Sequence, residues 1–142
     1  MDAKNPSTSD ATWIEINSSI EIGSIGADAA KVIGMPAGPI RLAVGVSGPK
    51  GYGLAHIAED RAQSLREIGF SAPRDAFVEV AANWELAIPA NEANKVVLVR
   101  KHRARYLRMV VQVFSGPNWT YWSATTIIIG RRVKESEIIY KK

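Results

Sequence analysis

His56 is the side chain of this sequence best suited to proton transfer near neutral pH, where histidine serves as a general base or acid. It follows a glycine-rich segment, Gly51-Tyr52-Gly53, and stands in the first turn of a predicted helix. The start of a helix offers free N–H groups and a positive dipole, which together bind phosphate. The alternative is an exposed histidine without a role, and the sequence leaves both interpretations open.

Two arginines could bind a phosphate or its pentacoordinate transition state, where a planar charged donor is most useful. Arg61 falls in the middle of the apolar face of the predicted helix. An arginine there is costly unless it is paired or opens into a cleft. Arg108 is predicted to lie beside Thr125 on one face of two adjacent strands. The alternatives are an ion pair of Arg61 with Glu85 or Asp75, and an ordinary cross-strand polar pair for Arg108.

A basic turn and nearby aromatic residues could bind a nucleic acid. The turn would contact the phosphate backbone through four residues: Lys101, His102, Arg103 and Arg105. Tyr121 and Trp119 could stack on bases, and Ser123 lies on the same strand face as Tyr121. The alternatives are a solvated turn and a hydrophobic-core role for the aromatic residues, which we expect for Trp122.

The basic residues concentrate in the last third of the chain. Residues 95–142 hold eleven Lys and Arg against two Glu, whereas residues 1–94 hold seven Lys and Arg against twelve Asp and Glu. A basic region of this density attracts polyanions and speeds the encounter with them. A nucleic acid is therefore the expected partner, and a solvated basic face that serves solubility is the alternative.

The composition excludes several classes of site. The absence of cysteine excludes disulfides, thiolate nucleophiles, iron–sulfur clusters and cysteine-based zinc sites, and two histidines leave little for a metal site. We therefore expect neither a metal nor another cofactor. The longest apolar run is four residues, whereas a membrane span needs roughly 20. No apolar signal-peptide region follows Met1, so no membrane association is expected.

The elements that position these residues follow from periodicity. Residues 54–68 predict a helix that ends at Gly69, and residues 74–84 predict a second, shorter helix. Residues 1–12 are polar and are expected to form a linker or frayed terminus ahead of a single domain over residues 13–142. An antiparallel meander is predicted at the end of the chain, with strands over residues 95–101, 105–114 and 119–130.

The loop between the last two strands sets the expected register. If residues 115–118 form the whole loop, Phe114 lies opposite Trp119. That register places Arg108 opposite Thr125 and leaves an arginine, a threonine, a serine and a tyrosine side by side on one face. This face is the predicted floor of a binding groove.

Two segments resemble the BECR-fold nucleases, the superfamily that groups barnase, EndoU, colicin-type and RelE-like ribonucleases. Gly53-Leu54-Ala55-His56-Ile57-Ala58-Glu59-Asp60-Arg61, preceded by Pro39-Ile40-Arg41-Leu42, is similar to their Gly-x-x-His-Ile-x-x-x-His segment. Tyr121-Trp122-Ser123-Ala124-Thr125-Thr126 looks like their late strand, which carries an aromatic residue and a threonine. The resemblance covers about residues 38–130. It implies an α+β fold with N-terminal helices packed on a C-terminal four-stranded antiparallel sheet.

The resemblance also implies metal-independent cleavage of RNA, in which the ribose 2′-hydroxyl attacks the neighbouring phosphate and leaves a 2′,3′-cyclic phosphate. His56 would act as general base or acid, and Thr125 or Thr126 would match the late threonine. Arg61 replaces a second histidine of the family and would bind phosphate without transferring a proton. Tyr121 would stack on a base or supply a proton, and the second acid–base group stays open.

The closest likeness is to phage-borne and contact-dependent-inhibition toxins. It implies an endoribonuclease toxin, with tRNA as one candidate substrate, that acts in the cytoplasm of a target bacterium as the C-terminal part of a larger secreted toxin. An acidic immunity or antitoxin protein is then the expected partner. The alternative function is a non-catalytic nucleic-acid-binding module that uses the basic face of the C-terminal sheet.

Overall fold

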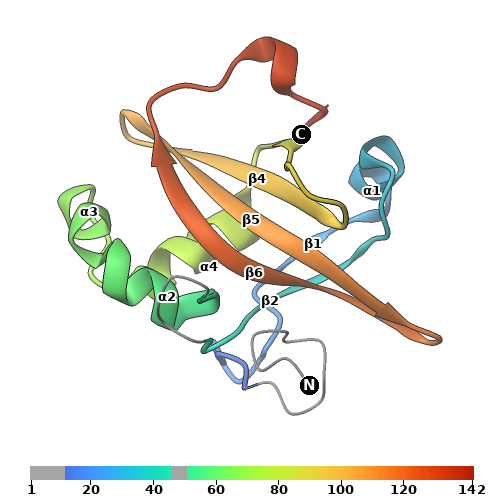
Figure 1. Cartoon of the computed structure of the whole chain (residues 1–142), viewed down its shortest axis with the longest axis horizontal. Coiled ribbons are helices and arrows are strands. Elements are labelled where there is room, and N and C mark those ends of the chain that lie inside the picture. Colours follow the sequence, from blue (N-terminus) through green and yellow to red (C-terminus); the bar gives the residue numbers. More distant parts are fainter. Residues whose placement is uncertain (1–11, 46–50) are drawn as a thin grey trace.

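The computed structural model describes residues 12–45 and 51–142, apart from the side chains of residues 58–60, and these form one seven-stranded mixed sheet (Figure 1). The strand order is β1-β2-β6-β5-β4-β3-β7. The strands are β1 (Gly23–Ile25), β2 (Gly38–Leu42), β3 (Leu86–Pro89), β4 (Lys95–His102), β5 (Arg105–Gly116), β6 (Trp119–Gly130) and β7 (Tyr140–Lys141).

This sheet shows that the expected fold, N-terminal helices packed on a C-terminal four-stranded antiparallel sheet, is wrong. The described chain forms seven strands rather than four, and the sheet is mixed because β2 runs parallel to β6. The N-terminal part of the chain supplies β1 and β2, so it extends the sheet at one edge instead of contributing helices alone. Ile40 and Leu42 of β2 are fully buried against β6, which explains why this edge belongs to the core.

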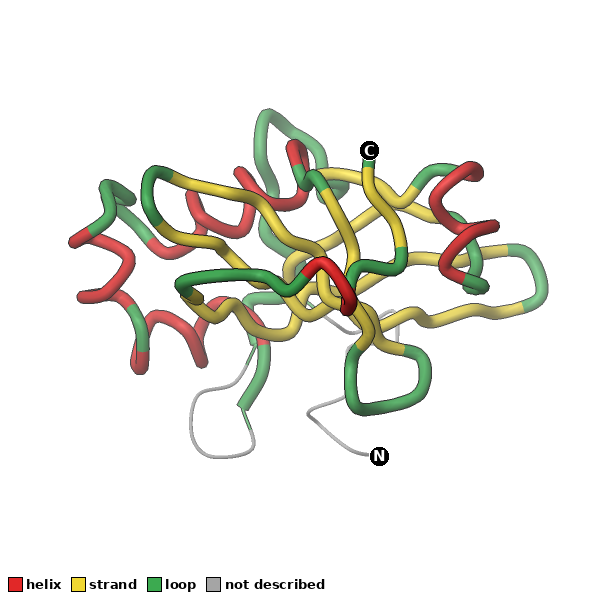
Figure 2. Tube along the Cα trace, turned by 90° about the horizontal axis from the view of Figure 1, so that it is seen from above, coloured by secondary structure: helices red, strands yellow, loops and turns green. Residues whose placement is uncertain are grey.

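The helices are short and lie between the strands along the chain. They are α1 (Ala27–Ile33), α2 (Gly53–Asp60), α3 (Ala62–Glu67) and α4 (Pro73–Asn83). The single helix predicted over residues 54–68 breaks at Arg61, whose φ of −129° leaves the helical region. Figure 2 shows α1 at one end of the sheet and the other three helices gathered toward the opposite end. No helix of the described chain is both long and apolar enough to cross a membrane.

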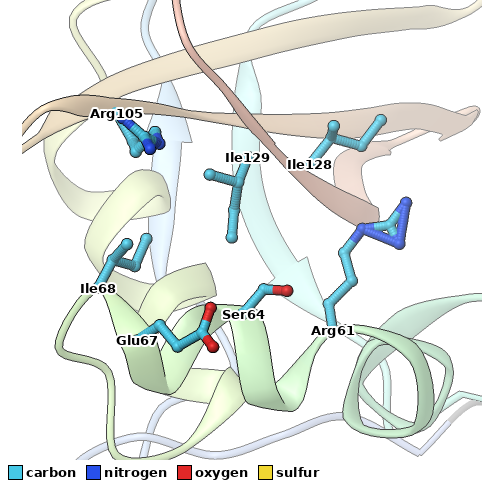
Figure 3. A pocket seen from close by; sticks show the side chains of 7 residues that line it. All are labelled: Arg61, Ser64, Glu67, Ile68, Arg105, Ile128 and Ile129. Atoms are coloured by element: carbon cyan, nitrogen blue, oxygen red, sulfur yellow. The ribbon is translucent and has the colours of Figure 1, made fainter.

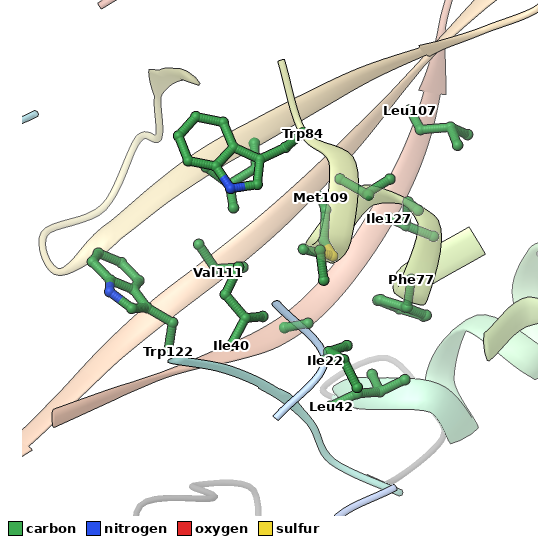
Figure 4. Packing of buried hydrophobic residues seen from close by; sticks show 14 of the residues in the cluster. Ile22, Ile40, Leu42, Phe77, Trp84, Leu107, Met109, Val111, Trp122 and Ile127 are labelled. Carbon is green, nitrogen blue, oxygen red and sulfur yellow. The ribbon is translucent and has the colours of Figure 1, made fainter. Parts of the chain in front are cut away.

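The main core lies between one face of the sheet and the helices (Figure 4). Side chains of alternate residues on β5 and β6 point into it, and the buried positions of Leu107, Met109 and Trp122 confirm the predicted core face. Two indole N–H groups connect distant segments: Trp84 donates to the carbonyl of Ser24, and Trp122 donates to that of Pro36. We call the other side of the sheet the outer face.

The β5–β6 register differs from the expected one. Gly116 lies opposite Trp119, so the turn is two residues long and the pairing is shifted by two. Because side chains alternate with a period of two, this shift preserves the predicted faces of β6 as far as Ala124. A bulge between Val110 and Val111 then leaves Thr125 outside the ladder, and Ile128 rather than Thr125 lies opposite Arg108. The bulge also reverses the alternation of β6, so Ile127, predicted on the face of Thr125, is fully buried in the core.

The C-terminal strap, residues 131–142, crosses the outer face. It covers a second apolar cluster with Val133 and Ile138, and its last strand, β7, pairs with β3. Both β3 and β7 were absent from the sequence prediction, because strands of four and two residues carry too little alternation to be recognised. The predicted linker at residues 1–12 lies almost entirely outside the described residues.

Candidate functional site

The start of α2 is held against the end of β2. The N–H of Leu54 donates to the carbonyl of Ala43 and that of Ala55 donates to the carbonyl of Val44, at 3.0 and 2.8 Å. Two of the N–H groups that a phosphate would need at this helix start are therefore already bound to backbone carbonyls. The phosphate site expected there keeps fewer donors than the sequence implies.

His56 lies on α2, half-buried, with its Nδ1 atom enclosed by protein. It lines neither of the two cavities described below. Arg61 and Arg108, two of the other candidate catalytic residues, each line one of these cavities without it.

The helix-edge cavity lies between α3 and the ends of β5 and β6, with a volume of about 590 Å³. It brings together Arg61, predicted to bind phosphate, and Arg105, predicted to bind RNA, although they are far apart in the sequence. Figure 3 shows both guanidinium groups at this cavity, with Ser64 and Glu67 reaching up from α3. Neither alternative ion pair of Arg61, with Glu85 or with Asp75, is present in the described chain, and Glu85 lies 3.3 Å from Arg100 instead.

The basic turn between β4 and β5 packs partly against the protein. The ring of His102 donates a hydrogen bond from Nε2 to the carbonyl of Ile68, at 2.8 Å, and its centroid lies 4.4 Å from that of the Phe70 ring. Lys101 and Arg103 are exposed. His102, one of the four residues of this turn predicted to bind RNA, therefore attaches the turn to the loop after α3.

The strap cavity, on the outer face beneath the C-terminal strap, has a volume of about 440 Å³. Arg108 and Thr125, the pair predicted to share one face, both line it despite the altered register. Arg108 donates from Nη2 to the carbonyl of Arg132 at 2.6 Å and lies 3.6 Å from a carboxylate oxygen of Glu137. Thr125 donates to the carbonyl of Val110 at 3.2 Å.

The Arg41 cluster occupies the part of the outer face next to the β2–β6 pair. The guanidinium carbon of Arg41 lies 4.5 Å from the centre of the Tyr121 ring and 5.6 Å from that of Trp13. The ring of Trp119 stacks on Tyr121 with centroids 5.7 Å apart. Tyr121 is only 5% exposed, whereas Trp119 is 48% exposed, so Trp119 is the ring that a base could reach.

Arg41 and Ser123 are neighbours on this face, because they are paired positions of the parallel strands β2 and β6. The Nε atom of Arg41 and the hydroxyl of Ser123 are both buried, and neither has a hydrogen-bond partner among the described residues. Burying a donor without a partner costs roughly 1–3 kcal/mol, and more for a charged group. Two such residues at paired positions therefore mark a place where hydrogen-bonding capacity is left unused within the described chain.

Tyr121 contributes a hydrogen-bond donor rather than a base. Burial raises the pKa of its phenol above the ordinary value, and the positive charge of Arg41 opposes part of that rise. The phenol is therefore protonated at neutral pH. The Tyr121 ring contacts both the guanidinium group of Arg41 and the ring of Trp119.

Arg41 is the residue that the sequence prediction missed as a site residue. The signal was present: it stands between Ile40 and Leu42, which both point into the core, so its side chain must point to the outer face. What the sequence does not show is the parallel pairing of β2 with β6, about 80 positions away, which places Arg41 beside Ser123.

No group of three or more His, Asp and Glu side chains that could hold a metal ion occurs in the described part of the chain. Comparison of the sequence with protein-family models and curated proteins, and of the structure with solved structures, finds no match. Function is therefore inferred from these residues themselves.

Proposed function

We propose that this domain binds single-stranded RNA on the outer face of its sheet, with a phosphate at Arg41 and Ser123 and a base on Trp119. The observation that carries the proposal is that Arg41 and Ser123, which are paired positions of β2 and β6, each hold a buried polar atom without a hydrogen-bond partner among the described residues, Nε and Oγ. A phosphate oxygen accepts hydrogen bonds from both a guanidinium and a hydroxyl, so one anion satisfies both groups.

The surroundings favour a nucleic acid over a small anion. Exposed Trp119 lies in the same cluster as Arg41 and offers a face on which a base can stack. Gln112 of β5 and Lys95 of β4 continue the row that begins with Arg41 and Ser123, so polar side chains cross four strands. The excess of nine positive charges over residues 95–142 attracts further phosphates along the strand.

Replacing Arg41 by glutamine should lower the affinity for a single-stranded RNA by about 10- to 150-fold, because a charge-assisted hydrogen bond contributes roughly 1.5–3 kcal/mol. The salt dependence of the binding constant should also become shallower by about 0.7, the value for one lost phosphate contact on a single strand. Fluorescence anisotropy with a labelled oligonucleotide at several salt concentrations measures both quantities.

The matched control is Arg66→Gln, which removes an exposed arginine of α3 that hydrogen-bonds to Gln63. It lowers the net charge equally and should leave affinity nearly unchanged. Equal losses in both variants would contradict a phosphate site at Arg41, and a DNA strand of the same sequence tests the preference for RNA.

Replacing Trp119 by alanine should weaken RNA binding by about 5- to 150-fold, since stacking contributes roughly 1–3 kcal/mol per base. The salt slope should not change, because no phosphate contact is lost. Val32→Ala, an exposed apolar residue of α1, is the control. A Trp119 variant with a changed salt slope and unchanged affinity at low salt would argue against stacking.

A second candidate function is metal-independent cleavage of the bound RNA with His56 as general base. One observation favours it: the backbone bonds from the start of α2 reach Ala43 and Val44, directly after β2, so one β2–α2 unit positions both His56 and Arg41. On this proposal the domain is a ribonuclease toxin of bacteria, and an acidic immunity protein would cover its basic face.

A further inference from the structure

We infer that the helix-edge cavity is a second phosphate site for the same RNA strand, which reaches it by crossing the open edge of β6. This inference rests on the proposed function, because it extends the strand bound at Arg41 and Ser123. It assigns Arg61 and Arg105 to a distant part of the RNA rather than to the reacting phosphate.

The first step is the open edge itself. β2 pairs with β6 only at residues 122–124, and in the described chain no other strand lies beside β6 from Thr126 to Gly130 on that side. The bulge at Thr125 marks the point where the two strands part. This edge is free of strand pairing but not bare, because α2 packs against β6. A flexible polymer that crosses it therefore passes beside α2 rather than beside another strand.

The second step is that two cavities meet at this edge. Ile128 is 42% exposed and lines both the strap cavity and the helix-edge cavity. The strap cavity lies on the outer face, and the helix-edge cavity lies on the side of α3. The hollow surface thus continues around Ile128 from one side of the sheet to the other.

The third step is the charge of the helix-edge cavity. Arg61 and Arg105 come from different elements, and neither forms an ion pair with a described residue. Ser64 adds a hydroxyl donor beside them. Glu67 also lines the cavity and opposes an anion, but it lies 3.5 Å from the amide nitrogen of Gln63, and the two arginines outnumber it. The cavity therefore offers two guanidinium groups to the phosphates of one strand.

The distance between the two sites sets a length requirement. Ile128 lies five positions after Ser123 in β6, which corresponds to about 16 Å along a strand. A dinucleotide bound at Arg41 does not reach around the edge, whereas an oligonucleotide of about ten residues does, and this is an ordinary site size for single-strand binders.

The test compares the double variant Arg61→Gln/Arg105→Gln with the wild type on a dinucleotide and on a single-stranded RNA of about ten nucleotides. The long RNA should lose affinity by at least about tenfold, and its salt slope should fall by about 1.4 for two lost phosphate contacts. Binding of the dinucleotide should stay unchanged. Arg66→Gln is the control for net charge, and Glu67→Gln, at an exposed residue, should tighten only the long RNA.

Each outcome separates the two proposals. If Arg41→Gln weakens the long RNA and the Arg61/Arg105 variant does not, the second site is wrong and the first is kept. If the double variant weakens both RNAs equally, the effect is one of overall charge and the path around β6 is wrong. If the wild type binds neither RNA, both proposals fail. If the double variant does not fold, the response to Glu67→Gln decides.

Discussion

Replacing His56 by alanine should lower the rate of RNA cleavage by about 10²- to 10⁴-fold, the usual contribution of a general acid or base. RNA affinity should change by less than about twofold, because His56 lines neither cavity and the Arg41 cluster is left intact. The assay is cleavage of bacterial RNA in EDTA, with tRNA among the substrates. Analysis of the product ends should show 2′,3′-cyclic phosphates for the wild type.

Two controls make this result interpretable. His56 is half-buried, so thermal unfolding of the His56→Ala variant must show that its fold is retained, and His56→Asn provides a smaller change in shape. Cleavage that persists in either folded variant would exclude His56 as the base. Intact RNA with the wild type and the variant alike, together with normal binding, would make the domain a non-catalytic nucleic-acid-binding module.

Replacing Gly45 by alanine should lower the free energy of unfolding by about 2–6 kcal/mol. Gly45 has a φ of +80°, and a Cβ atom there would overlap the carbonyl oxygen of Tyr52. A strained backbone costs roughly 1–3 kcal/mol and overpacking a similar amount. Gly53, with a φ of +72°, faces it, and a Cβ there would lie 2.6 Å from the carbonyl oxygen of Ala43. The two glycines allow the chain to close where α2 joins β2.

Gly34→Ala is the matched control, since Gly34 has a φ of +82° but no heavy atom within 4 Å of a Cβ at that position. It should cost only about 1 kcal/mol. Chemical unfolding of the three proteins measures the differences. Equal destabilisation by Gly45→Ala and Gly34→Ala would show that backbone conformation alone matters there, and that the close approach of Gly45 to Tyr52 does not.

The sequence predicted those parts of the fold in which the pattern is long and local. The meander over β4, β5 and β6 was predicted correctly, and so was its buried face up to the bulge at Thr125, because strands of eight and twelve residues carry clear alternation. The overall architecture was not, because β1, β2, β3 and β7 are two to five residues long and pair with distant segments. Their places in the sheet depend on tertiary packing, which local periodicity does not contain.

The candidate site was predicted in pieces rather than as a whole. Arg108 with Thr125, and Arg61 with Arg105, each share a cavity as their chemistry suggested. Their separation into two cavities could not be predicted, because it depends on the bulge at Thr125 and on the helix break at Arg61. Arg41 was missed because it lies beside Ser123 only through the parallel pairing of β2 with β6, and these strands are far apart in the sequence.

The way the sheet ends has a consequence for solubility. Its outermost strands, β1 and β7, are three and two residues long, and β7 is followed by Lys142. Short and charged edge strands offer neighbouring molecules little backbone to pair with, so self-association through these edges is disfavoured. Within the described chain, the isoleucine-rich edge of β6 from Thr126 to Gly130 pairs with no strand and depends on the packing of α2 against β6, which is lost when the chain partly unfolds. Amyloid-like aggregation of a partly unfolded chain should therefore begin at this edge, and a bound polyanion that covers it should delay aggregation.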